Sequence, residues 1–247
     1  MRPIIGITSN FGMNKEDPER PQSYLLAGYS DGVFAAGGIA QPVPVPPEHD
    51  AALLDELLAH YDGLIFTGGY DLDPRDYGQR PHPRTHALHP RRDRFELDFF
   101  RRADAKKKPI FGSCLGHQVA HVARGGRLIQ HVDDLGLSPE VAHHTANEEN
   151  TFHDVRVESD SRLARIVGGA RVEVASRHHQ IVDGDNLGQG LRTVGVSADG
   201  VVEASEDCDG RFLLTVQWHP EDQLDCREHL ALFAALVEQA ARRSAFG

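Results

Sequence analysis

A cysteine between two glycines is the residue of this sequence best placed for nucleophilic chemistry. Cys114 follows a short apolar run, stands between Gly112 and Gly116, and precedes apolar residues at helical spacing that begin with Leu115. This order predicts a short buried strand, a sharp turn and a helix. A helix N-terminus favours the thiolate, and the N–H of Leu115 there can bind a developing oxyanion. The alternative is a small structural cysteine in the core, which the two flanking glycines disfavour.

A second motif, His219-Pro220-Glu221, supplies the groups that a cysteine nucleophile needs. Histidine titrates near neutrality, so His219 can take the thiol proton and later deliver a proton to a leaving amine. Pro220 restricts the backbone between the two side chains, and Glu221 can orient the imidazole and stabilise its charged form. A surface turn without function is the alternative.

A pair of glycines follows the apolar run at residues 63–67. Gly68 and Gly69 come directly after this predicted strand, where α/β sheets place their ligand loops. Because no side chain shields its backbone, the N–H of Gly69 can approach a substrate and form the second half of an oxyanion hole with Leu115. An ordinary turn after a strand is the alternative.

The first half of the chain alternates short apolar runs with helical patterns. We expect strands at residues 4–8, 39–45, 63–67 and 110–111, a loop at 10–20, and helices at 24–36, from 48–50 through Leu58, and at 91–105. Pro42 and Pro44 favour an edge position for the second of these strands. The alternation predicts an α/β fold with a central, mostly parallel sheet and helices on both faces.

The second half has a different pattern, with short strands separated by turn signals. We expect strands at residues 127–130, 155–157, 172–174, 192–196, 201–204 and 212–216, and a last helix at 227–243. These strands predict a small antiparallel extension that packs onto the first half. Residues 133–150 are polar and predict an extended loop over the active edge. With no long linker in the sequence, we expect one domain over residues 1–247.

Composition limits the class of partner. The formal net charge of −11 argues against binding to nucleic acid or to an anionic membrane, and no run of 18 apolar residues predicts a membrane span. Cys114, Cys208 and Cys226 are widely spaced, which indicates free thiols and, with no signal peptide evident, a cytoplasmic location. His117 and His121 share a helix face, but no third zinc ligand accompanies them, so we expect no metal site. Three further histidines, His82, His86 and His89, lie in a Pro-rich segment and are expected to be solvated.

Taken together, two motifs resemble the class I glutamine amidotransferase fold, which is flavodoxin-like. They are Cys114-Leu115-Gly116-His117-Gln118 and Gln217-Trp218-His219-Pro220-Glu221. Within that superfamily the chain is most similar to the peptidase C26 branch, the γ-glutamyl-γ-aminobutyrate hydrolases. The segments that carry this closer resemblance are 4–8, 68–78, 92–97, 176–180 and 199–204. The resemblance implies a Cys-His-Glu triad that cleaves a γ-glutamyl amide through a γ-glutamyl thioester, without a metal or organic cofactor.

The resemblance also implies substrate contacts at Gln118, His178, His179 and Gln180, although two adjacent histidines between strands are usually a surface loop. Glu96 is either a contact to the substrate or its neighbours, or a carboxylate on the helix surface. The branch usually has arginine after the nucleophile, where this chain has Leu115. This difference keeps open an alternative, a glutaminase subunit that passes ammonia to a partner synthase. A small-molecule γ-glutamyl substrate is the expected ligand, and a homodimer remains possible.

Overall fold

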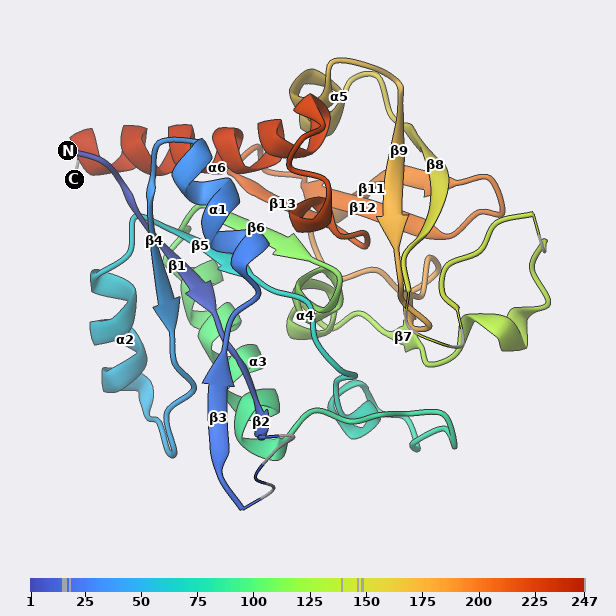
Figure 1. Cartoon of the computed structure of the whole chain (residues 1–247), viewed down its shortest axis with the longest axis horizontal. Coiled ribbons are helices and arrows are strands. Elements are labelled where there is room, and N and C mark those ends of the chain that lie inside the picture. The colour runs from blue at the N-terminus through green and yellow to red at the C-terminus, as the bar shows by residue number, and fades with distance from the viewer. Residues whose placement is uncertain (15–16, 18, 139, 146, 148, 247) are drawn as a thin grey trace.

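A nine-stranded sheet runs through the computed structural model, which describes residues 1–14, 17, 19–138, 140–145, 147 and 149–246 (Figure 1). The strand order is β4-β1-β5-β6-β13-β12-β11-β8-β9. The first five of these pair in parallel, namely β4 (Ile39–Val43), β1 (Ile4–Thr8), β5 (Gly63–Phe66), β6 (Ile110–Ser113) and β13 (Leu213–Val216). Strand β4, which contains Pro42, lies at the edge of the sheet as predicted, because proline cannot donate to a ladder.

The remaining strands of this sheet are antiparallel. They are β12 (Val202–Asp207), β11 (Leu191–Ser197), β8 (Thr151–Val157) and β9 (Arg171–Ser176). They join the parallel part through the pairing of β12 with β13, in which Ala204 lies opposite Val216. The predicted fold class is therefore confirmed. The antiparallel strands continue the same sheet beyond β13, whereas the sequence predicted that they pack onto the first half.

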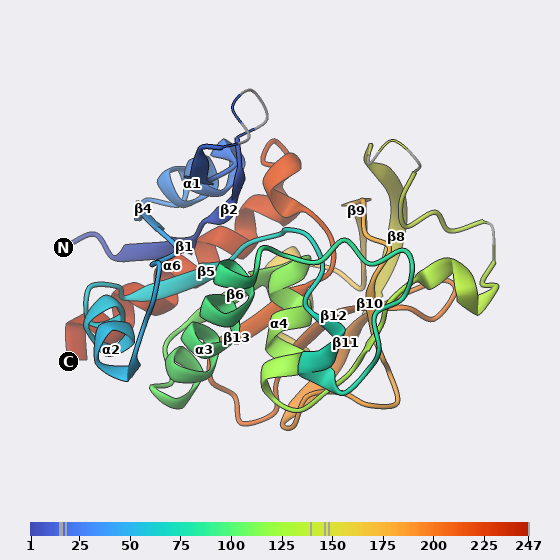
Figure 2. The ribbon, with the colours of Figure 1, turned by 90° about the horizontal axis from the view of Figure 1, so that it is seen from below.

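Within the described residues, six α-helices cover the two faces of the sheet (Figure 2). One face packs against α1 (Ala27–Ala35), α5 (Arg162–Val167) and α6 (Arg227–Phe246), and the other against α2 (Ala51–Ala59), α3 (Pro90–Ala105) and α4 (Leu115–Ala123). Successive strand residues point to opposite faces, so Ile65 joins the first core while Leu64 and Phe66 join the second. The short strands are therefore apolar throughout and hold the sheet rigidly between two cores.

The segment before α1 differs from the prediction. Strands β2 (Asn10–Met13) and β3 (Pro21–Tyr24) form an antiparallel pair where the sequence predicts a loop and the start of a helix. Of that predicted loop, Lys15, Glu16 and Pro18 lie outside the described residues. Helix α1 begins only at Ala27, after Leu26, whose side chain offers no cap. Strand β3 is largely polar and exposed, and β2 has only Phe11 and Met13 as apolar residues, so the apolar pattern was too short to reveal them.

Shorter elements complete the part of the chain that the structure describes. Strand β7 (Leu128–Ile129) pairs with β10 (Ile181–Val182), which the sequence analysis missed, as it missed α5. Three short 3₁₀ helices follow strands or loops: η1 (Pro74–Tyr77), η2 (Val132–Leu135) and η3 (Pro220–Asp222). In the predicted loop 133–150, Pro139, Ala146 and Glu148 lie outside the described residues. Among the described residues, no helix combines the length and apolar character that a membrane crossing requires.

Candidate active site

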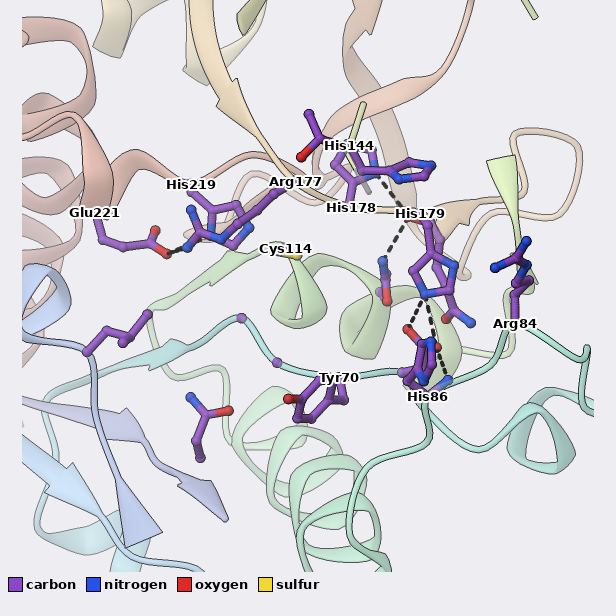
Figure 3. Close-up of a pocket in the computed structure, with 18 of the residues that line it drawn as sticks. Tyr70, Arg84, His86, Cys114, His144, Arg177, His178, His179, His219 and Glu221 are labelled. Carbon is purple, nitrogen blue, oxygen red and sulfur yellow. Dashed lines mark hydrogen bonds and ion pairs between the residues drawn. The ribbon is translucent and has the colours of Figure 1, made fainter. Parts of the chain in front are cut away.

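Three neighbouring parallel strands deliver the predicted catalytic groups to one edge of the sheet. Strand β5 leads to Gly68 and Gly69, β6 leads to Cys114, and β13 leads to His219. Because β5, β6 and β13 are adjacent and parallel, their carboxyl ends open on the same side. Figure 3 shows the result, with Cys114 beside His219 and Glu221 at the wall of a cavity.

The backbone at Cys114 adopts a rare conformation. Its φ is +51° and its ψ is −104°, in the region that L-residues seldom occupy. The N–H of Cys114 donates to the carbonyl of Val216 at 2.8 Å, which fixes the turn against β13. A side chain at Gly116 would collide with the carbonyl of Phe66, so only glycine lets α4 begin this close to β5. The predicted turn with a thiol at its apex is therefore present.

His219 and Glu221 form a short buried contact. Nδ1 of His219 lies 2.6 Å from Oε1 of Glu221, and both side chains are almost fully buried. Burial lowers the pKa of His219, but the Glu221 carboxylate and the neighbouring Cys114 outweigh it and raise that pKa to about 10. The carboxylate thus holds one ring nitrogen and leaves Nε2 for the thiol, as the predicted roles require.

The predicted oxyanion groups, Gly69 and Leu115, lie against each other. A Cβ added to Gly69 would stand 2.9 Å from Cδ2 of Leu115 and would collide with the guanidinium of Arg92. The glycine loop therefore reaches the first turn of α4, where the N–H of Leu115 has no partner within the helix. This arrangement permits two N–H groups to bind one oxygen.

Tyr29 connects the glycine loop to the acid of the predicted triad. The N–H of Gly68 donates to the Tyr29 hydroxyl at 2.9 Å, and this hydroxyl donates to Oγ of Ser113 at 3.1 Å. The Ser113 hydroxyl in turn lies 3.2 Å from Oε2 of Glu221. Burial raises the pKa of Tyr29 well above its usual range, so the phenol remains a donor. The sequence analysis missed Tyr29, for which no local motif exists.

A buried ion pair between Arg92 and Glu96 supports the loop of Gly68 and Gly69. Arg92 of α3 donates to the carbonyl of Gly68 at 3.1 Å and to Glu96 at 3.4 Å, and both charged side chains are fully buried. Thr8 donates to the other oxygen of Glu96 at 2.8 Å. Glu96 is neither a helix-surface carboxylate nor among the residues that line the cavity. Its place next to Arg92 makes it a support of the glycine loop.

The cavity at this edge has a volume of about 430 Å³, the size of a small-molecule site. All four predicted substrate contacts line it: Gln118, His178, His179 and Gln180. Gln118 donates to the carbonyl of Gln180 at 3.1 Å. The amide of Gln180 is 1% exposed, and neither its nitrogen nor its oxygen has a hydrogen-bond partner among the described residues. A buried amide without a partner is poised to bind a polar ligand.

The two adjacent histidines have different surroundings. His178 is buried, so the surface-loop alternative is wrong for it. His179 is half-buried, and its Nε2 lies 3.1 Å from both carboxylate oxygens of Asp71, a residue of the loop after Gly69. His179 therefore ties the segment between β9 and β10 to the glycine loop.

Other residues of the cavity wall were missed. Arg177 lies 3.5 Å from Oε1 of Glu221 and also pairs with Asp222. Its position next to His178 in the chain was the only available signal. Tyr70 was also missed, although it lies in segment 68–78, which carries the resemblance. Other missed residues come from segments without a motif: Asn10, Tyr24, Leu26, Arg84, His86, His131, His144 and Thr145. His86 is exposed, as predicted, yet it stands at the cavity rim (Figure 3).

The histidine pair of α4 is engaged with hydroxyl groups. Nδ1 of His117 lies 2.8 Å from Oγ1 of Thr215, and Nε2 of His121 lies 3.0 Å from Oγ of Ser205. The other nitrogen of His121 accepts from the N–H of Gly188 at 3.1 Å. These contacts explain why two histidines can be buried side by side in α4, because each buried ring has a polar partner.

The comparisons with known proteins identify the family and the fold. The model of the Peptidase C26 family matches residues 3–221. The chain is 42% identical to "Putative glutamine amidotransferase Rv2859c" of Mycobacterium tuberculosis, over 97% of this chain and 75% of that protein. It is 30% identical to "Gamma-glutamyl-gamma-aminobutyrate hydrolase PuuD" of Escherichia coli K12, over 89% of this chain and 85% of that protein. The chain belongs to the peptidase C26 family.

Solved structures share the fold at low sequence identity. The glutaminase domain of Trypanosoma brucei CTPS with bound acivicin superposes with a TM-score of 0.65 at 18% identity, over 97% of this chain and 94% of that one. A glutamine amidotransferase of Thermotoga maritima gives 0.61 at 15% identity, over the whole of both chains. These likenesses establish a class I glutamine amidotransferase fold.

Proposed function

We propose that this protein is a cysteine-dependent hydrolase that cleaves γ-glutamyl amides through a γ-glutamyl thioester on Cys114 and releases glutamate and an amine. The observation that carries the proposal is the 2.6 Å contact between His219 and Glu221 beside a cysteine held at φ +51°. A strained nucleophile, an oriented imidazole and a nearby pair of candidate N–H donors form the combination that acyl transfer needs.

In the first half of the reaction, the Cys114 sulfur attacks the γ-carbonyl carbon. The carbonyl oxygen becomes an oxyanion, which the N–H groups of Gly69 and Leu115 receive. The imidazolium of His219 then gives its proton to the amide nitrogen, so the C–N bond breaks and the amine leaves. Glu221 orients the ring and stabilises its charged form before this transfer, which is consistent with the high pKa of His219.

In the second half, water replaces the amine. Neutral His219 accepts a proton from the water, whose oxygen attacks the thioester carbon. The C–S bond then breaks, glutamate leaves, and the Cys114 thiolate is restored next to the protonated ring. These steps use only side chains, backbone groups and water, so the proposal requires no metal or organic cofactor.

Two observations support the proposed substrate class: the residues of the cavity wall and the names of the relatives. The buried, unpaired amide of Gln180 offers both a donor and an acceptor, which suits the amino-acid end of a γ-glutamyl group. The relative named a γ-glutamyl-γ-aminobutyrate hydrolase supports γ-aminobutyrate, or a related amine, as the leaving group. We place the reaction in the cytoplasm, because Cys114, Cys208 and Cys226 are all unpaired thiols that a reducing compartment preserves.

The direct test is steady-state release of glutamate by the purified chain alone. The substrates are γ-glutamyl-γ-aminobutyrate, other γ-glutamyl amines and free glutamine, with Cys114→Ala as the control. We expect fast release from at least one γ-glutamyl amine, weak glutaminase activity, and no turnover by the variant. An active Cys114→Ala protein would overturn the mechanism.

A second candidate is the glutaminase subunit of an amidotransferase. The string from Cys114 to Gln118, with Leu115 after the nucleophile, favours it, as do relatives named as glutamine amidotransferases. The same assay separates the two candidates. Turnover of glutamine alone, or turnover only after a synthase is added, would assign the chain to the second class.

A further inference from the structure

A second cluster of ionisable side chains lies against the cavity wall, to which His178 belongs, and includes none of the predicted catalytic groups. Three imidazoles surround one oxygen, Oε1 of Glu203 in β12. Nε2 of His153 lies 3.2 Å from it, Nδ1 of His143 lies 3.3 Å from it, and Nε2 of His178 lies 3.7 Å from it. All four side chains are at least nine-tenths buried, and they come from four separate segments of the chain.

The hydrogen bonds on the far side of two rings leave a conflict at Glu203. Nε2 of His143 lies 2.9 Å from the Asp199 carboxylate, and Nδ1 of His178 lies 3.1 Å from the carbonyl of Gln180. Both partners only accept, so these two nitrogens carry the protons. A neutral ring then turns a lone pair toward the carboxylate of Glu203, which is also an acceptor. Either a second proton on a ring or a bound cation removes this repulsion.

Several buried atoms of the cluster also lack a hydrogen bond. Nε2 of His178, Nδ1 of His143 and Oε2 of Glu203 have no hydrogen-bond partner among the described residues. His178 is the decisive case, because its ring is 2% exposed and its free nitrogen is aimed at the centre of the cluster. Buried polar atoms without partners are costly, and a missing ion is one of the ordinary explanations.

The separations of the three imidazole nitrogens from Oε1 of Glu203 fit the ligand spacing of a tetrahedral metal ion. With metal–ligand bonds of about 2.0–2.1 Å, tetrahedral geometry separates the ligand atoms by roughly 3.4 Å. The observed separations from Oε1 of Glu203 are 3.2, 3.3 and 3.7 Å. The donor atoms of His143, His153 and Glu203 also lie within 4.8 Å of one another. Metal-bound histidines typically donate their other ring N–H to a carboxylate or carbonyl, as Asp199 and Gln180 permit here.

We propose that His143, His153, His178 and Glu203 form a binding site for a divalent transition-metal ion, with Zn²⁺ as the best match. Three imidazole nitrogens and one carboxylate oxygen are ligands that zinc accepts in tetrahedral geometry. The site is structural, because all four positions are filled by the protein. It replaces the expectation, drawn from the α4 histidines and the family resemblance, that the chain holds no metal.

The proposed site also explains how one wall of the active-site cavity is held. The carbonyl of Gln180 accepts from Gln118 at 3.1 Å as well as facing Nδ1 of His178. A metal on the opposite nitrogen of His178 would therefore fix the segment that carries the Gln180 amide, which has no hydrogen-bond partner among the described residues. The metal would act on the shape of the cavity and not on the reacting atoms.

Metal binding itself tests the proposal, independently of any enzymatic activity. The chain is produced in zinc-supplemented medium, freed of its affinity tag and analysed by inductively coupled plasma mass spectrometry. Chelator-treated protein is then titrated with Zn²⁺ alone. We expect about one zinc per chain, and a lower thermal midpoint after chelation that Zn²⁺ restores. Purified wild-type protein that neither contains zinc nor binds it in the titration would overturn the proposal.

Substitutions test which residues bind the zinc ion. Glu203→Gln and His153→Asn should lose the zinc. Asp199→Asn should weaken binding by about 10- to 100-fold, because Asp199 contacts the proposed ligand His143 and is not itself a ligand. His229→Asn, which removes a buried histidine elsewhere, and His131→Asn, which removes one from the cavity rim, should retain it. If Glu203→Gln does not fold, Asp199→Asn and the zinc titration of the wild-type protein still test the proposed site. Loss of zinc in His131→Asn with retention in Asp199→Asn would place the ion at the rim and contradict the proposed site.

Discussion

The hydroxyl of Tyr29 accepts the N–H of Gly68 at 2.9 Å, and this single bond fastens helix α1 to the loop that carries the candidate oxyanion group. The same hydroxyl donates to Ser113, which contacts Glu221. One chain of hydrogen bonds therefore connects the loop of the candidate oxyanion group to Glu221, the acid of the candidate triad. Shared support of this kind lets a site keep its geometry while the reaction proceeds.

Tyr29→Phe should lower kcat/KM and destabilise the fold. The change leaves the buried N–H of Gly68 without a partner, which costs about 1–3 kcal/mol of the free energy of unfolding. Urea unfolding and glutamate release measure the two effects. Tyr77→Phe is the matched control, because the Tyr77 hydroxyl is buried without a partner among the described residues. Equal losses in both variants would show that the Tyr29 hydroxyl has no special role.

Gly69→Ala should reduce kcat by about 10²- to 10³-fold, the usual loss for one oxyanion donor. The added Cβ would collide with Arg92 and press on Leu115, so the loop must move away from the nucleophile. Steady-state kinetics measures the loss. Gly12→Ala is the control, since nothing lies within 4 Å of its added Cβ. A Gly69→Ala enzyme with wild-type kcat would remove Gly69 from the oxyanion hole.

Gln180→Leu should lower the activity of the enzyme without lowering its stability. If the buried amide binds substrate, its loss lowers kcat/KM by about 1.5–3 kcal/mol, or roughly 10- to 150-fold, as for hydrogen bonds to charged groups. The free energy of unfolding should stay equal or rise, because the amide has no partner among the described residues of the protein. Gln118→Leu should instead lose stability, since its amide donates to the carbonyl of Gln180. Unchanged kinetics in Gln180→Leu would exclude the proposed substrate contact.

The His219–Glu221 contact should make stability depend on pH. Burial lowers the pKa of His219, but Glu221 and Cys114 raise it to about 10. An unfolded histidine titrates near about 6.5. The native ring therefore binds its proton more tightly, so its stabilising contribution is complete below about pH 6.5 and is lost as the pH rises through about 10. The unfolding free energies of wild type and His219→Asn should differ most at about pH 6 and converge above about pH 10. A constant difference would contradict the raised pKa.

Sequence patterns within a few residues of Cys114 were sufficient to predict its turn. Two glycines, an apolar strand and a helical pattern lie within a few residues of one another, so the sequence alone indicates the geometry. Helix α5 also had local signals, a capping Ser161 and a terminal Gly168 at φ +77°, which the analysis overlooked. Strands β2 and β3 had only weak signals, because each is four residues long and β3 is largely polar.

The supports of the site could not be predicted in this way. Tyr29 reaches Ser113 across 84 residues of sequence, and Arg92 reaches Gly68 across 24. The cluster around Glu203 gathers histidines from three other segments. Such contacts are fixed by the stacking of the helices and strands, and each residue alone resembles an ordinary surface or core position. They become visible only when the packed fold is known.

The most direct test of the account is intact-mass analysis of the acyl-enzyme. The purified chain is mixed with γ-glutamyl-γ-aminobutyrate or another cleaved γ-glutamyl amide and quenched in acid within the first turnovers. Peptide mapping then locates any adduct. The account predicts a γ-glutamyl thioester on Cys114 that is absent from Cys114→Ser, together with loss of turnover in that variant. Undiminished glutamate release by Cys114→Ser would contradict it.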